Sequence, residues 1–63
     1  MKVSEFLEKW LLDERLNYKS IFTVYFNKKY YSCTIQELNQ VFGRCKCEWI
    51  YKKGQNWFQI KVA

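Results

Sequence analysis

The sequence predicts a small α+β domain in which two helices pack on one face of a four-stranded, mainly antiparallel sheet. Three observations predict it: apolar residues at helical spacing near the N-terminus, a capping box at Thr34, and two-residue alternation through residues 20–33 and 45–62. Each half of the chain then holds a helix followed by a hairpin, which gives the order αββαββ. With 63 residues the chain is short, so we expect a single domain over residues 1–63.

The first helix is expected over residues 4–16, where apolar side chains recur every three or four positions. Ser4 is a suitable N-cap, and Glu5 follows it where the helix dipole favours an acidic side chain. Leu12 and Leu16 fall outside the main apolar arc of this helix. We therefore expect these two leucines to contact a second element or a partner protein.

A capping box predicts the start of the second helix. Thr34 and Glu37 stand three positions apart, so the Thr34 hydroxyl can accept from the Glu37 amide while the Glu37 carboxylate accepts from the Thr34 amide. Apolar residues continue on one face to Phe42, and Gly43 can adopt the left-handed conformation that commonly ends a helix. The predicted helix covers residues 35–42.

The remaining segments predict two hairpins. Residues 20–26 and 30–33 are rich in aromatic and β-branched side chains, and Asn27-Lys28-Lys29 separates them as a tight turn. Residues 45–52 and 57–62 alternate with a period of two, and a turn over residues 53–56 joins them.

Alternation divides the strand residues between two faces of the sheet. Cys47 and Trp49 are expected under the helices, together with Phe22, Val24, Phe26, Phe58, Ile60 and Val62. The opposite, open face is expected to carry Thr23, Tyr25, Lys46, Glu48, Trp57, Gln59 and Lys61, with Tyr30 or Tyr31 beside them.

A winged helix-turn-helix is the alternative fold. Residues 34–43 resemble the first helix of that motif, with Gly43 at the turn and Trp49 near an apolar position of a second helix over about 46–53. Arg44 and Lys52 depart from it, because apolar residues are usual there. The two-residue alternation from Cys45 onward also favours a strand.

The charge is unevenly placed along the chain. The net charge is +5, yet residues 1–16 hold three basic and four acidic side chains, whereas residues 17–63 hold eight basic and two acidic ones. Such an excess is typical of proteins that bind a polyanion, because Lys and Arg neutralise phosphates and release counterions. Colloidal solubility is the competing explanation for a charge of this size.

Composition argues against several kinds of chemistry. The chain contains no His and only two Gly, so a nucleophile has no conventional base and no glycine-rich phosphate loop can form. We expect no enzymatic activity and no cofactor. Cys33, Cys45 and Cys47 are too few for a zinc site within one chain, and we expect them to be small buried hydrophobes, with a metal between two chains as the alternative.

The N-terminal segment does not have the pattern of a signal peptide, and 18 apolar residues never follow one another. We therefore expect a cytoplasmic protein with reduced cysteines and no membrane contact.

Aromatic rings interleaved with cations on the open face predict binding of nucleic acid, single-stranded DNA above all, in an accessory role in replication, recombination or transcription control. Lys52 and Lys53 should lie at one end of the sheet, and Lys28, Lys29, Arg44 and Lys46 at the opposite end. The predicted contacts are Lys28, Lys29, Arg44, Lys46, Lys52, Lys53, Lys61, Tyr25, Tyr30 and Trp57.

An interaction protein is the alternative function. Leu12, Leu16 and the open-face rings would leave more apolar surface bare than a domain of this size usually exposes. Such a protein would dock on a larger enzyme or regulator as an inhibitor or subunit, or form a homodimer through its open face. Among chains this short we expect proteins of phages and other mobile elements.

Overall fold

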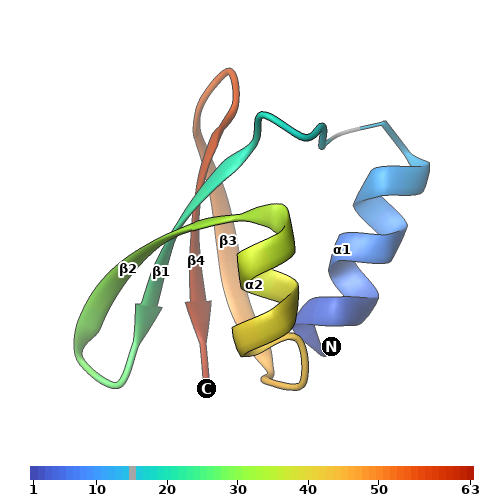
Figure 1. The fold of residues 1–63 in the computed structure, drawn as a ribbon. Coiled ribbons are helices and arrows are strands. Elements are labelled where there is room, and N and C mark those ends of the chain that lie inside the picture. The colour runs from blue at the N-terminus through green and yellow to red at the C-terminus, as the bar shows by residue number, and fades with distance from the viewer. Residues whose placement is uncertain (15) are drawn as a thin grey trace.

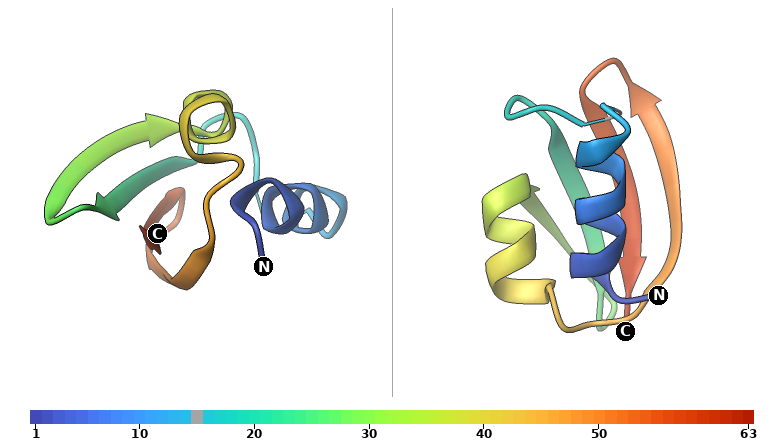
Figure 2. Two further views of the ribbon diagram at one scale, coloured as in Figure 1. Left: turned by 90° about the horizontal axis from the view of Figure 1, so that it is seen from below. Right: turned by 90° about the vertical axis from the view of Figure 1, so that its right-hand side faces the viewer.

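The protein is a mixed four-stranded sheet with both helices on one side, as the computed structural model shows (Figures 1 and 2). The structure describes residues 1–14 and 16–63. The elements are α1 (Val3–Leu12), β1 (Ile21–Phe26), β2 (Lys29–Thr34), α2 (Ile35–Phe42), β3 (Cys47–Gly54) and β4 (Trp57–Val62). The predicted α+β class is confirmed.

The strand order across the sheet is β2-β1-β4-β3. The two hairpins, β1 with β2 and β3 with β4, are antiparallel, and they join through a parallel pairing of β1 with β4. Hairpins form between strands that are adjacent in the sequence, so local pattern predicts them. The central parallel pair joins residues about 36 positions apart, such as Ile21 and Trp57. Two-residue alternation does not predict which distant strands pair.

The winged-helix alternative is wrong for residues 46–53. Most of this segment lies in β3, where the second helix of that motif was expected. Cys47, Trp49 and Tyr51 are poor helix formers and favour a strand, which pairs along β4.

Helix α1 is shorter than predicted and begins earlier. It starts at Val3 because Lys2 is the N-cap, and the Glu5 carboxylate accepts a hydrogen bond of 3.2 Å from the Lys2 amide. The predicted cap, Ser4, instead lies inside the first turn, where its amide donates to the Gly43 carbonyl at 3.0 Å. The helix ends at Leu12, and position 15, which the prediction included, lies outside the described residues.

Helix α2 has the predicted bounds and the predicted cap. The Glu37 amide donates to the Thr34 hydroxyl at 3.2 Å, and the Thr34 amide donates to the Glu37 carboxylate at 3.0 Å. The expected left-handed Gly43 is wrong, since its backbone is right-handed, with φ −56° and ψ −33°. Glycine is needed there for another reason: a Cβ would overlap the carbonyl oxygen of Asn39.

The turn between β1 and β2 consists of Asn27 and Lys28, with φ values of 52° and 66°. Positive φ at both central residues is what a type I′ turn requires, and its twist matches that of the flanking strands. Asn tolerates this conformation well, whereas Lys does so only with strain.

The core lies between the helices and the sheet. Phe22 and Phe58 stack at 5.3 Å at its centre, and Phe6 and Trp10 of α1 pack edge-on against them. Leu16 is only 5% exposed and belongs to this core, although it lies beyond the last helical residue. Of the two contacts expected for it, the one with a second element is therefore found, and a role at a protein interface is wrong.

Neither of the helices in residues 1–14 and 16–63 is long and apolar enough to span a bilayer.

Candidate functional site

The open face of the sheet is the candidate site. Opposed residues on neighbouring strands point to the same side, so the buried Phe22 and Phe58 mark the side under the helices. The residues that alternate with them form the open face: Ile21, Thr23 and Tyr25 of β1; Tyr30, Ser32 and Thr34 of β2; Glu48, Trp49 and Tyr51 of β3; and Trp57, Gln59 and Lys61 of β4.

Five aromatic rings lie on this face, in two pairs and one single ring. Tyr25 and Tyr30 stand opposite each other with ring centroids 4.9 Å apart. Trp49 and Tyr51 are also 4.9 Å apart on the outer strand β3. Trp57 is the single ring and lies near the end of the face away from the β1–β2 turn. Its indole Nε1 donates to the Thr23 hydroxyl at 2.9 Å.

These rings are accessible to a ligand. Tyr30, Tyr51 and Trp57 are 64%, 58% and 50% exposed, which is high for large rings in a domain with a well-filled core. Tyr25 and Trp49 are partly buried, because each is covered on one side by its neighbour. Tyr25, Tyr30 and Trp57 thus lie where the alternation predicts.

Trp49 is a residue that sequence reasoning missed. Strict alternation from Cys47 placed it under the helices. The pairing of β3 with β4 contains an irregularity between Cys47 and Trp49, so that Cys47 opposes Val62 while Trp49 opposes Lys61. A bulge of this kind inserts one residue and reverses the side on which the following residues lie. No feature of the local sequence indicates it.

Lys61 lies among the rings. Its Nζ is 5.8 Å from the centroid of the Tyr25 ring and 3.2 Å from Oε2 of Glu48. The side chains of Lys61 and Glu48 are 39% and 37% exposed, so solvent screens this ion pair and it adds little to stability. A matched donor and acceptor thus lie at the end of the open face nearest the β1–β2 turn.

A hollow of about 470 Å³ opens at the end of the face beside the β1–β2 turn. The Tyr25 ring and the side chains of Lys28 and Lys61 line it, together with Phe26, Asn27, Val62 and Ala63. Two ammonium groups and one ring in the same hollow can hold a phosphate and a neighbouring base at once.

The remaining predicted cations lie around this face, and two of them leave the sheet on the helix side. Lys46 exchanges two backbone hydrogen bonds of 3.0 Å with Ala63, at the same end as the β1–β2 turn, and Arg44 precedes it in an exposed loop. Lys29 opposes Phe26, and Lys52 opposes the buried Phe58. The side chains of Lys29 and Lys52 therefore lie on the helix side of the sheet and not beside the rings of the open face.

Lys53 lies at the opposite end of the sheet from Lys46, as predicted, in a second irregularity of β3 between Lys52 and Gly54. The arrangement brings Lys28, Lys46 and Lys61 to one end of the open face. It leaves Lys53 at the far end, near Trp57, which opposes Gly54.

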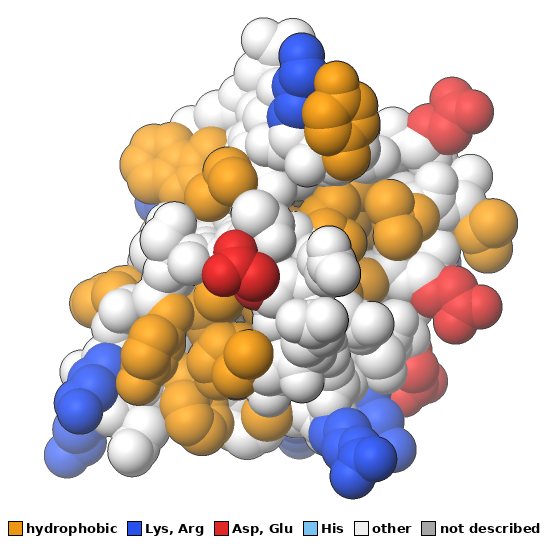
Figure 3. Space-filling view, viewed as in Figure 1, with side chains coloured by type: hydrophobic (Ala, Val, Ile, Leu, Met, Phe, Trp, Pro, Cys, Tyr) orange, Lys and Arg blue, Asp and Glu red, His pale blue; other side chains and the backbone are white. Residues whose placement is uncertain are grey.

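Acidic and basic side chains lie in different parts of the surface on the helix side. Figure 3 shows acidic side chains over α1, with Lys and Arg groups mainly along the lower edge of the molecule. The four acidic groups of residues 1–16 lie in α1 or directly after it. They repel a polyanion, whereas the Lys and Arg groups of the lower edge attract one.

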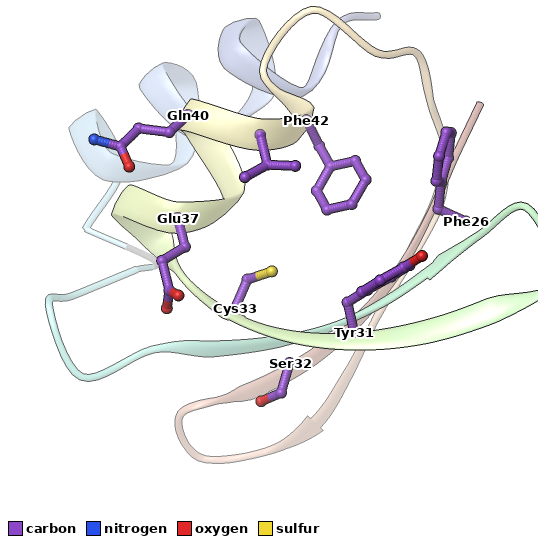
Figure 4. A pocket seen from close by; sticks show the side chains of 8 residues that line it. Phe26, Tyr31, Ser32, Cys33, Glu37, Gln40 and Phe42 are labelled. Atoms are coloured by element: carbon purple, nitrogen blue, oxygen red, sulfur yellow. The ribbon is translucent and has the colours of Figure 1, made fainter.

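A second hollow, of about 520 Å³, lies between α2 and β2 on the helix side (Figure 4). Tyr31 and Phe42 face each other across it, with centroids 5.9 Å apart, and the Cys33 sulfur points toward them. Burial raises the pKa of the Cys33 thiol, and the nearby Glu37 carboxylate raises it further. The thiol is therefore neutral, and a neutral thiol is a poor nucleophile.

The other cysteines pack against the core. Cys45 and Cys47 are partly buried there, and burial raises the pKa of the Cys47 thiol. Within the described part of the chain no three His, Cys, Asp or Glu side chains gather as metal ligands would.

Comparison with protein-family models, with curated proteins and with solved structures gave no match for this chain.

Proposed function

We propose that the protein binds single-stranded nucleic acid, with DNA as the expected form, across the open face. The observation that carries this proposal is the hollow at the end of the face, which Tyr25, Lys28 and Lys61 line together. The Tyr25 ring and a lysine can there contact the base and the phosphate of one nucleotide.

Stacking supplies the first part of the binding energy. Each base that stacks on an exposed ring contributes about 1 to 3 kcal/mol, and every base has a face that can do so. Tyr30, Tyr51 and Trp57 are the most exposed of the five rings on the open face. Their spread over β2, β3 and β4 allows several successive bases to be held.

Phosphate contacts supply the second part. Lys28 and Lys46 lie at one end of the face and Lys53 at the other. Binding through such contacts weakens steeply as salt rises, because each neutralised phosphate releases counterions.

Single strands are favoured over duplexes by the same geometry. In a duplex the faces of the bases are already stacked on one another, so the rings of the open face would have no partner. Duplex DNA would meet only the lysines. An accessory role in replication, recombination or transcription control is consistent with a small protein that covers exposed single strands.

The test is the fluorescence of Trp10, Trp49 and Trp57 during titration with a thymidylate nonamer, a uridylate nonamer and a duplex. We expect the single strands to quench the fluorescence, the duplex to bind more weakly, and binding to weaken between about 50 and 200 mM salt. The two nonamers separate DNA from RNA as the preferred strand. Binding that is absent at low salt would overturn the proposal.

Docking on a larger protein is the second candidate function. Leu12 is 79% exposed, and Leu11 and Tyr18 are exposed beside it. A hollow between the helices adjoins them, lined by Leu11, Tyr18, Thr34, Ile35 and Gln36. Saturable binding to one protein that is insensitive to salt and is abolished by Leu12→Asp would support this function.

A further inference from the structure

A carboxylate lies beside the lysines at one end of the open face. Glu48 is paired there with Lys61, and its charge would repel a phosphate. Lys28, Lys46 and Lys53, which form no ion pair among the described residues, suit phosphates instead. If a single strand crosses this face, it must therefore meet Glu48 with a base rather than with a phosphate.

The surroundings of Glu48 suit a base edge. One carboxylate oxygen, Oε2, lies 3.2 Å from Nζ of Lys61, and no described residue donates a hydrogen bond to the other. Trp49 opposes Lys61 on one side, and the Tyr25 ring lies 5.8 Å from the same ammonium group on the other. A base stacked on either ring would turn its hydrogen-bonding edge toward this pair.

We infer that the Glu48–Lys61 pair reads the Watson–Crick edge of guanine, an inference that rests on the proposed function. Guanine presents two adjacent N–H donors, N1–H and N2–H, next to the O6 acceptor. The two oxygens of Glu48 accept from the two donors, and the Lys61 ammonium donates to O6. Bidentate, charge-assisted contacts of this kind are among the strongest hydrogen bonds in proteins.

The other three bases match the pair less well. Adenine and cytosine each offer one amino group to the carboxylate, and thymine offers a single N3–H. Each can satisfy only one carboxylate oxygen with its Watson–Crick edge. The pair therefore discriminates because only guanine gives two hydrogen bonds to Glu48 and accepts one from Lys61.

The test compares four nonamers, three of which carry a single guanine, adenine or cytosine at the centre of a thymidylate strand. A good bidentate contact discriminates by at least about 1 kcal/mol, so the guanine strand should bind at least about fivefold more tightly than the other three. In Glu48→Gln this preference should fall below about twofold, because the amide offers one acceptor and turns an NH₂ group toward the second guanine donor. Affinity for the thymidylate nonamer should stay the same or rise, since a negative charge is removed.

Glu8→Gln is the matched control. It removes the same charge from an exposed position on α1, away from the open face, and should keep the preference for guanine. Equal binding of the four nonamers by the wild-type protein, or a preference that survives Glu48→Gln, would overturn the inference alone. Failure of every nonamer to bind at low salt would overturn the proposed function and the inference with it.

Discussion

The indole of Trp57 is fixed in place by Thr23, whose hydroxyl oxygen accepts a hydrogen bond of 2.9 Å from Nε1. Trp57 opposes Ile21 across the β1–β4 pair, so the ring leans along the sheet to reach Thr23 two residues away. A half-exposed ring is thereby held in one orientation before any ligand arrives. Such preorganisation lowers the entropy that binding must remove.

Replacing Thr23 by Val keeps the shape of the side chain and removes the acceptor. We expect a small change in the free energy of unfolding, because water can replace this exposed hydrogen bond. Affinity for a thymidylate nonamer should fall by about 0.5 to 1.5 kcal/mol, the usual cost of ordering one side chain on binding. Fluorescence titration measures it. Ser32→Ala, which removes an open-face hydroxyl without a hydrogen bond in the described residues, should leave affinity unchanged.

Leu16 and Leu12 form a matched pair for stability. Leu16→Ala should lower the free energy of unfolding by about 2 to 5 kcal/mol, because it opens a cavity in the core. Leu12→Ala should change it by less than about 0.5 kcal/mol, since that side chain already faces solvent. Urea unfolding followed by circular dichroism measures the free energy of unfolding of both variants. Equal effects of the two substitutions would show that the core is not arranged as described.

Lys28 carries strain that glycine would remove. Its φ of 66° suits glycine, and Asn-Gly is the favoured pair in a type I′ turn. We expect Lys28→Gly to raise the free energy of unfolding by about 0.5 kcal/mol. Glycine removes the cost of a left-handed lysine, but it loses more backbone entropy on folding, so only part of that cost is recovered.

Lys29→Gly is the control for that substitution. It removes the same charge at a strand position where φ is not positive, so it should lower stability. If both substitutions raised the free energy of unfolding, the increase in Lys28→Gly would come from the lost charge rather than from the turn.

The capping box of α2 makes stability depend on pH. The hydrogen bond from the Thr34 amide, and then that with the Thr34 side chain, lower the pKa of Glu37 below its ordinary value of 4.5. The ionised carboxylate therefore favours the folded state above the unfolded-state pKa, and this contribution is lost as pH falls through the folded-state pKa. The stability difference between wild type and Glu37→Gln should be largest at neutral pH and vanish in acid. A difference that stays constant from neutral to acidic pH would contradict this role.

Removing the other half of the box should have a larger and simpler effect. Thr34→Ala deletes the acceptor of the Glu37 amide, and loss of an N-cap costs about 1 kcal/mol.

Local signals predicted the elements that depend on neighbouring residues. The Thr34–Glu37 box predicted the start of α2, because the cap and the first turn are a few residues apart. The end at Phe42 was predicted from the apolar face of the helix, although Gly43 is not left-handed. Helix α1 was predicted less well, since its start depends on Val3 and Ser4 donating to carbonyls of the loop at residues 43–45. These hydrogen bonds join segments about 40 positions apart, so a local sequence pattern cannot predict them.

The open face was predicted in outline from the alternation of Tyr25, Trp57 and Lys61. The bulge before Trp49 changed the membership of this face, and it depends on how β3 pairs with β4. Register between strands is set by the whole sheet, so one irregularity moves a large ring from the core side to the surface.

The dependence of affinity on salt tests the central claim most directly. Log affinity for a thymidylate nonamer against log salt should fall for the wild-type protein, and the slope should flatten by about 1.4 in Lys28→Gln/Lys46→Gln, since each lost phosphate contact on a single strand removes about 0.7. Trp57→Ala should weaken binding by about 1 to 3 kcal/mol with the slope unchanged. Lys9→Gln/Lys19→Gln, with the same loss of charge outside the open face, should behave as wild type. Equal slopes for the two lysine pairs, or a slope that changes with Trp57, would contradict the division of this face into stacking rings and phosphate-binding ends.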